Sequence, residues 1–184
     1  MYGPVIEGEL VRLRPPRADD AEAMNGWFED LEVTRYLFIR NPPGIDAEKE
    51  WLDARARDPD SVNWAVEFEG RLVGGTGIHM IDWKNGWGTT GTVLGDRAVW
   101  GRGLGRELMQ LRTDYAFTQL SLRKLKSSHI DGNDASHRAQ VAAGYRVVGR
   151  YRADRWVDGQ WRDLILTEVL RKDWERKRRA RGRV

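Results

Sequence analysis

The 184-residue chain contains no cysteine, which excludes disulfide bonds and every reaction that depends on a cysteine thiolate. It also lacks a run of about 18 or more apolar residues, the length that a transmembrane helix needs. The first residues, Met1-Tyr2-Gly3-Pro4, do not form a signal-peptide pattern. We therefore expect a protein of the cytoplasm that has no membrane partner.

Histidine is scarce and scattered, at His79, His129 and His137, and no pair has a metal-ligand spacing such as His-x-x-x-His. We therefore expect no metal cofactor. The chain also has no Gly-x-Ser-x-Gly motif and no evident Ser-His-Asp arrangement, so nucleophilic hydrolase chemistry finds no support. What remains is chemistry that needs few protein groups, such as acyl transfer from an activated thioester to an amine.

Positive charge is concentrated at one end of the sequence. Residues 171–184 contain eight Lys/Arg and two Asp/Glu, a net charge of +6, and the whole chain carries +3, so residues 1–170 carry −3. We expect one domain over residues 1–170 and a basic tail over 171–184. A mildly acidic domain argues against a nucleic-acid-binding face. The tail is expected to be a solvated, frayed terminus, with RNA or an acidic partner as the alternatives.

Hydrophobic periodicity predicts one domain of mixed α/β class. The expected strands cover residues 9–14, 62–69, 72–82, a segment that ends at Leu94, 122–130, 145–153 and 161–170. The expected helices run from Asp19 or Asp20 to about Phe28, and over 46–57, 104–120 and 136–143. Asn133 and Gly144 are the expected caps of the last helix. The stretch 31–40 is ambiguous and is followed by the break Asn41-Pro42-Pro43-Gly44.

The most informative stretch, residues 93–106, places a glycine-rich loop between an apolar strand and an amphipathic helix. Gly101, Gly103 and Gly105 occupy alternate positions, and Arg102 and Arg106 add positive charge. Glycine allows close approach of the backbone to a ligand, and the first N–H groups of the helix carry the positive end of its dipole. This combination predicts an anion site for phosphate or pyrophosphate. The alternative is a tight connection without a ligand, because neither the P-loop ending nor the dinucleotide glycine spacing is present.

From Val93 to Gly149 the sequence resembles the GNAT superfamily of acyl-CoA-dependent N-acyltransferases. The pyrophosphate loop of that family, Q/R-x-x-G-x-G/A, matches Trp100 to Gly105, with Trp100 in place of Gln or Arg. Further matches, in the family's order, are Asp114-Tyr115-Ala116-Phe117, Asn133-Asp134-Ala135-Ser136 and Ala143-Gly144-Tyr145. The branch it resembles contains the ribosomal-protein alanine and spermidine N-acetyltransferases. The resemblance implies one α+β domain, with a mixed, largely antiparallel sheet of six to seven strands and about four helices.

The resemblance also implies how acetyl-CoA, the expected co-substrate, is bound. Val93 and Leu94 would pair their backbone with the pantetheine arm, and Asn133 would hydrogen-bond that arm or act only as a helix cap. Ser136 would lie near the CoA side of the site, as a catalytic and CoA-binding residue. The pyrophosphate would be held by Gly101, Arg102, Gly103, Leu104, Gly105 and Arg106. The acetyl group would pass to a primary amine by direct attack in a ternary complex. The acceptor would be a protein N-terminus, a polyamine, an amino sugar or an amino acid derivative, and a homodimer is compatible with this resemblance.

Two departures from the family pattern concern proton transfer. Thr89 stands where many relatives carry a carboxylate, and Gln140 stands where many carry a tyrosine that protonates the leaving thiolate. Neither side chain performs acid–base chemistry at neutral pH, so the base is expected at His79 or Asp82, or in a water relay. The same departures leave open a non-catalytic acyl-CoA sensor or scaffold.

Nine tryptophans are many for this length. Aromatic walls suit a cationic amine, although filling of the core is the alternative for most of these side chains. Trp64 and Trp100 are expected to be structural. The tryptophans expected at the edges of an acceptor groove are Trp27, Trp51, Trp83, Trp87, Trp156 and Trp161.

Overall fold

The computed structural model describes residues 1–39 and 41–181. Its strands are β1 (Ile6–Glu7), β2 (Val11–Arg14), β3 (Val62–Phe68), β4 (Arg71–Asp82), β5 (Trp87–Leu94), β6 (Lys124–Ile130), β7 (Arg146–Val157) and β8 (Gln160–Leu170). Its helices are α1 (Asp20–Trp27), α2 (Leu31–Thr34), α3 (Ile45–Arg57), α4 (Leu104–Thr118), α5 (Asp134–Ala143) and α6 (Arg171–Arg181), with a 3₁₀ turn η1 (Arg97–Val99). The ambiguous stretch contains α2, and its last residue, Arg40, lies outside the described residues.

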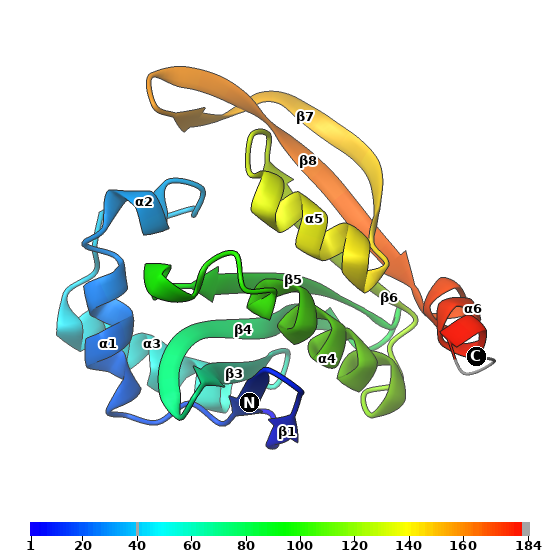
Figure 1. Ribbon diagram of the computed structural model, residues 1–184. Coiled ribbons are helices and arrows are strands. Elements are labelled where there is room, and N and C mark those ends of the chain that lie inside the picture. The colour runs from blue at the N-terminus through cyan, green and yellow to red at the C-terminus, as the bar shows by residue number, and fades with distance from the viewer. Residues whose placement is uncertain (40, 182–184) are drawn as a thin grey trace.

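All the strands belong to one eight-stranded sheet in the order β1-β2-β3-β4-β5-β6-β8-β7 (Figure 1). Neighbouring strands are antiparallel except β5 and β6, which are parallel. The mixed, largely antiparallel α/β class is therefore confirmed. The expected six to seven strands and about four helices were too few, because the sequence did not reveal the short elements β1 and α2 or the terminal helix α6.

Helices cover both faces of the first half of the sheet. α4 packs on one face through Leu104, Leu108 and Phe117, each at most 1% exposed, and these side chains form the main core with apolar residues of β2, β3 and β4. On the other face, Met24 of α1 and Leu52 of α3 form a smaller cluster. The apolar spacing along α4 predicted this packing, because side chains four residues apart lie on one face of a helix.

The parallel pair β5–β6 positions the site because the two strands separate. They pair only where Trp87–Thr89 lies beside Lys124–Lys126. Beyond that point β5 continues to Leu94 and β6 continues to Ile130 without further pairing. Figure 1 shows the consequence: β1–β5 and β6–β8 diverge, with α4 and α5 beside the diverging strands. The end of β5 therefore has no strand on one of its edges.

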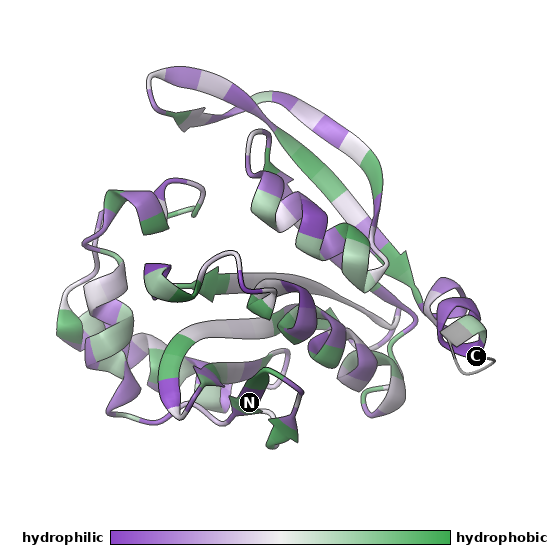
Figure 2. Ribbon diagram, in the orientation of Figure 1, coloured by the Kyte–Doolittle hydropathy of each residue, from purple (hydrophilic) through white to green (hydrophobic). Residues whose placement is uncertain are grey.

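The basic C-terminal segment is a helix over its described part, so the expectation of a frayed terminus was wrong for Arg171–Arg181. The Trp174 ring lies 5.5 Å from that of Phe117, and its indole N–H donates to Asp114 of α4. Lys177 Nζ also donates to the carbonyl oxygen of Ala142 at 2.8 Å. The end of β8 is hydrophobic and α6 is mostly hydrophilic (Figure 2). One aromatic anchor thus docks a helix whose remaining side chains are largely polar.

Candidate functional site

The loop from Gly101 to Gly105 has the geometry of an anion site. Gly101 and Gly103 have φ values of +78° and +89°, which side chains other than glycine rarely adopt. No backbone amide from Gly101 to Gly105 has a hydrogen-bond acceptor within the described chain. A Cβ at Gly101 would meet no atom within 4 Å, and one at Gly103 only Leu10 Cδ1 at 3.8 Å. Unpaired amides that face open space at the N-terminus of α4 can bind an anionic group.

Hydrogen bonds of Trp100 and Glu107 fix this loop in place. The Trp100 indole donates to the carbonyl oxygen of Leu94 at 2.9 Å, which ties the loop to the end of β5. The Glu107 carboxylate accepts the amides of Leu10 and Val11, each at 2.9 Å, and so anchors the first turn of α4 to β2. Trp100 is therefore structural, as expected, although its side chain is 42% exposed.

Arg102 and Arg106, expected to add charge at the loop, are both exposed and make no ion pair with a described residue. The Arg102 guanidinium lies 5.7 Å from the centre of the Phe68 ring. Both cations therefore remain available to an anionic ligand.

The start of α5 holds the other residues expected on the CoA side. Asn133 caps α5, with its side-chain oxygen accepting the amide of Ser136 at 3.0 Å. The hydroxyl of Ser136 accepts a hydrogen bond from the Gln140 amide at 3.1 Å. Gln140 is 2% exposed, and its other partners are the Ser128 carbonyl and the Thr167 hydroxyl. Gln140 therefore joins α5 to β6 and β8, and its side chain has no proton-transfer role.

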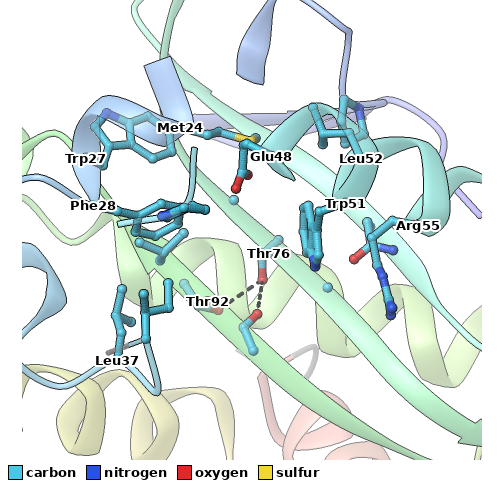
Figure 3. Close-up of a pocket in the computed structure, with 18 of the residues that line it drawn as sticks. Met24, Trp27, Phe28, Leu37, Glu48, Trp51, Leu52, Arg55, Thr76 and Thr92 are labelled. Carbon is cyan, nitrogen blue, oxygen red and sulfur yellow. Dashed lines mark hydrogen bonds between the residues drawn. The ribbon is translucent and has the colours of Figure 1, made fainter. Parts of the chain in front are cut away.

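A pocket of about 470 Å³ opens on the α1–α3 face of the sheet. Its floor is the glycine-rich part of β4 and β5, including Gly75, Gly77 and Gly91, and Gly91, Thr92 and Val93 bring β5 into the lining. Its walls come from α1, α3 and the segment after α2 (Figure 3). They are mainly apolar or aromatic: Met24, Trp27, Phe28, Leu37, Phe38, Trp51 and Leu52.

The wall formed by residues 37–39 is held from the far half of the sheet. Arg35 pairs with Asp158 at the tip of the β7–β8 hairpin, and the Arg155 guanidinium lies 4.1 Å from the centre of the Phe38 ring. Tyr36 packs against a small cluster of buried apolar side chains from β6, β7 and β8. Residues 35–39 thus contribute a wall of the pocket and also contact the β6–β8 half of the sheet, so they connect the two diverging halves.

Glu48 is the acidic side chain of this pocket. It is only 6% exposed and has no hydrogen-bond or ion-pair partner within the described part of the chain. Burial alone raises the pKa of its carboxyl above the ordinary value. Figure 3 shows the carboxylate pointing into the pocket between Trp51 and Phe28. Glu48 was not among the site residues expected from the sequence, although its position between Ile45 and Leu52, on the apolar stripe of α3, was a usable signal.

His79, a proposed base, lines the same pocket. Its ring lies over Gly77, where a Cβ would come within 2.6 Å of the imidazole. Burial, and next the positive charge of Arg112, lower the pKa of His79 to about 4. The imidazole is therefore neutral at pH 7. Its cross-strand partner is Thr89, so these two side chains share a face of the sheet.

Asp82, the other proposed base, lies elsewhere. Its carboxylate accepts the backbone amide of Asn85 at 2.8 Å and the Asn85 side chain at 2.7 Å, which lowers its pKa. These bonds shape the turn between β4 and β5, and Asp82 is not among the residues that line the pocket. His79 and Asp82 are therefore not brought together.

A fully buried arginine beneath the pocket floor was also missed. Arg112 of α4 is 1% exposed and donates to Thr76 Oγ1 at 2.6 Å, Thr92 Oγ1 at 2.8 Å and the Gly91 carbonyl at 2.8 Å. It pairs with no carboxylate in the described structure. Its position four residues after Leu108, on the buried face of α4, was the signal in the sequence.

The tryptophans divide differently from the expectation. Of the six assigned to the acceptor groove, Trp27 and Trp51 line the pocket, and the other four are not in its lining. Trp64 is 1% exposed and its indole donates to the Pro4 carbonyl, so it is structural as expected, although it also borders the pocket.

Within the described residues, no group of three or more His, Cys, Asp or Glu side chains is arranged to hold a metal ion. No helix in that part of the chain is long and apolar enough to cross a membrane.

Comparison with known proteins gives the family. The acetyltransferase (GNAT) domain model matches residues 11–146. "Probable N-acetyltransferase YjcK" of Bacillus subtilis (strain 168) is 31% identical and covers 93% of this chain and 99% of its own. Spermidine N(1)-acetyltransferase of Escherichia coli (strain K12) is 23% identical and covers 84% of this chain and 83% of its own. The crystal structure of spermidine N-acetyltransferase from Vibrio cholerae, in complex with CoA and spermine, matches with a TM-score of 0.84 at 18% identity, covering 91% and 99% of the two chains.

The chain therefore belongs to the acetyltransferase (GNAT) domain family. It is an acetyl-CoA-dependent N-acetyltransferase. The family that the sequence motifs indicated is confirmed, and spermidine N-acetyltransferases are among its relatives.

Proposed function

We propose that this protein transfers the acetyl group of acetyl-CoA to a primary amine by direct attack in a ternary complex. The observation that carries the proposal is that one strand serves two sites. β5 lines the apolar pocket with Gly91, Thr92 and Val93, and beyond Leu94 the chain leads through the 3₁₀ turn η1 into the glycine loop. An acceptor in the pocket and a thioester along the unpaired edge of β5 would meet at this strand.

The loop and the start of α5 fit the CoA moiety. The unpaired amides of residues 101–105 would bind the pyrophosphate, and Arg102 and Arg106 would add charge. The backbone of Val93 and Leu94 would pair with the pantetheine arm, because this part of β5 has no strand beside it. Asn133 already caps α5, so any bond to the arm would be additional to that capping role.

The chemistry needs one proton to leave the amine. The acceptor nitrogen forms a C–N bond to the thioester carbonyl carbon, the C–S bond breaks, and CoA leaves as a thiolate that takes a proton from water. His79 is the proposed acceptor of the amine proton, because it lines the pocket as a neutral imidazole. Its pKa of about 4 makes it a weak base that would pass the proton on to water. We therefore propose that His79 and water molecules together carry the amine proton away.

The test is release of free CoA thiol from acetyl-CoA over a panel of amines: a peptide N-terminus, a diamine, an amino sugar and an amino acid ester. We expect thiol release with at least one class, with loss of CoA binding in Gly103→Val. If the protein binds CoA and releases no thiol with any amine, it is an acyl-CoA-binding protein without turnover.

A further inference from the structure

We propose that Glu48 binds a second positive charge on the acceptor, so that the preferred substrate is a diamine or another amine that carries an additional cationic group. The inference rests on the proposed function, because it assigns the acceptor of that reaction. Its basis is a carboxylate, 94% buried, that has no partner among the described residues and points into an aromatic pocket.

The carboxylate of Glu48 has no counter-ion among the described residues. An unpaired carboxylate loses the hydration it has in water, and this loss favours its neutral form, as its raised pKa reflects. Arg55, the Lys/Arg side chain among the described residues that line the pocket, is already engaged: it pairs with Asp58 at 2.9 Å and lies 5.9 Å from the Trp51 ring centre. A cation brought by a ligand would thus be a counter-ion that no described residue of the chain provides to Glu48.

Aromatic side chains form the pocket wall near the Glu48 carboxylate. Trp27, Phe28 and Trp51 line the pocket on the side where Glu48 points. An ammonium group beside aromatic faces is stabilised by the ring quadrupoles, more so when water is partly excluded. The same walls give methylene groups an apolar surface. The pocket therefore suits an alkyl chain that ends in an ammonium group.

The ammonium group held by Glu48 would not be the nitrogen that attacks the thioester. A nearby carboxylate stabilises the charged form of an amine and raises its pKa, whereas attack on a thioester requires the uncharged form. The nitrogen held by Glu48 is therefore a poor nucleophile while it is bound. It anchors the acceptor, and a different nitrogen of the same molecule reaches His79 and β5.

The experiment compares 1,4-diaminobutane with 1-aminopentane, which has a methyl group in place of the second amine. Thiol release is measured for the native protein, for Glu48→Gln and for Glu50→Gln, a matched control that removes an exposed charge from the same helix. We expect the native enzyme to prefer the diamine in kcat/KM. Glu48→Gln should remove that preference through a KM about 10- to 100-fold higher for the diamine, with kcat nearly unchanged. Glu50→Gln should behave as the native enzyme.

Calorimetry of 1,4-diaminobutane binding to the three proteins, without acetyl-CoA, separates this inference from the proposed function. Diamine binding that depends on Glu48, without thiol release, leaves the cation site standing and overturns the acetyl transfer. Thiol release with equal efficiency on both amines, unaffected by Glu48→Gln, overturns the cation site and leaves the transfer standing. A kcat lowered for both amines alike in Glu48→Gln also overturns it, because Glu48 would then act on the reacting nitrogen. Glu48→Ala, checked by circular dichroism, must reproduce the loss of preference.

Discussion

The guanidinium of Arg112 lies 2.8 Å from the carbonyl oxygen of Gly91, directly beneath the strand that lines the pocket. Arg112 also binds the hydroxyls of Thr76 and Thr92, which bond to each other at 3.0 Å (Figure 3). A buried, unpaired guanidinium therefore has two effects: it holds β4 and β5 together from below, and its charge reaches His79 on the other face.

Replacing Arg112 with methionine should lower the free energy of unfolding by about 1–3 kcal/mol, because the Gly91 carbonyl and two threonine hydroxyls each lose the hydrogen bond from the guanidinium. The pKa of His79 should rise above about 4, since a positive charge that disfavours the imidazolium is gone. Urea denaturation and an NMR titration of the imidazole measure the two effects. Arg138→Met, at an exposed position of α5, should change neither. An unchanged His79 titration in folded Arg112→Met would contradict this coupling.

Replacing His79 with alanine should lower kcat by about 10²-fold, a typical loss when general-base help is removed. The shape of the kcat profile between pH 6 and 9 should be the same in both proteins, because the pKa of His79 is about 4 and its ionisation lies below this range. Steady-state kinetics over this pH range provide the check. A wild-type kcat in His79→Ala would leave proton removal to water alone.

The same low pKa predicts how stability depends on pH. Between the unfolded value of 6.5 and the folded value of about 4, the unfolded chain binds more protons at His79 than the folded one. The stability associated with neutral His79 is therefore present above about pH 6.5 and is lost as the pH falls toward 4. Urea denaturation of His79→Asn should show a smaller loss over this interval than the native protein shows.

Gly103→Val should raise the dissociation constant for CoA by at least about 10²-fold, because Gly103 has φ +89° at the point where the backbone approaches the anion. The control is Gly159→Val, which imposes comparable strain at φ +74° in the β7–β8 turn, far along the chain from the loop. Calorimetry with CoA should detect binding in the control and not in Gly103→Val. Equal CoA affinity in both folded variants would contradict the assignment of residues 101–105 as an anion site.

Glu48→Gln should raise the melting temperature at pH 7.5. The folded pKa of Glu48 is above its usual value of 4.5, so the folded protein binds more protons than the unfolded chain between these two values. Stability therefore falls as the pH rises through that interval, and glutamine removes the effect. The expected rise is about 2–4 °C for each kcal/mol of relieved desolvation. Thermal scans at pH 4 and 7.5 should show the gain at the higher pH only.

Two truncations separate the anchor of α6 from its charge. Removing the residues after Trp174 should leave acyl transfer to small amines nearly unchanged, because the loop and the pocket lie within residues 1–170. Removing the residues after Leu170 also removes the contact of Trp174 with Phe117 and should lower the melting temperature by several degrees. Activity lost in the first truncation with a small acceptor would show that the distal half of α6 supports the site.

The sequence by itself determined the parts of the protein whose signals are local. Glycines at alternate positions between a strand and a helix specified the loop of residues 101–105, because unusual φ values are a property of glycine itself. The caps Asn133 and Gly144 likewise fixed the ends of α5, as they provide a side-chain acceptor and a left-handed residue where the helix needs them. These features led to the family, and the family model matches.

Only the tertiary structure decided what surrounds each charged side chain. Glu48 and Arg112 carry ordinary charges on helices, and their burial arises because α3 and α4 cover opposite faces of the sheet. Asp82 binds Asn85 within the turn between β4 and β5. Gln140 binds Thr167, which is distant in the sequence, and so helps to pack α5 against the sheet. A pattern of residues gives the face on which a side chain lies, whereas its desolvation and its partners depend on elements that meet only when the chain has folded.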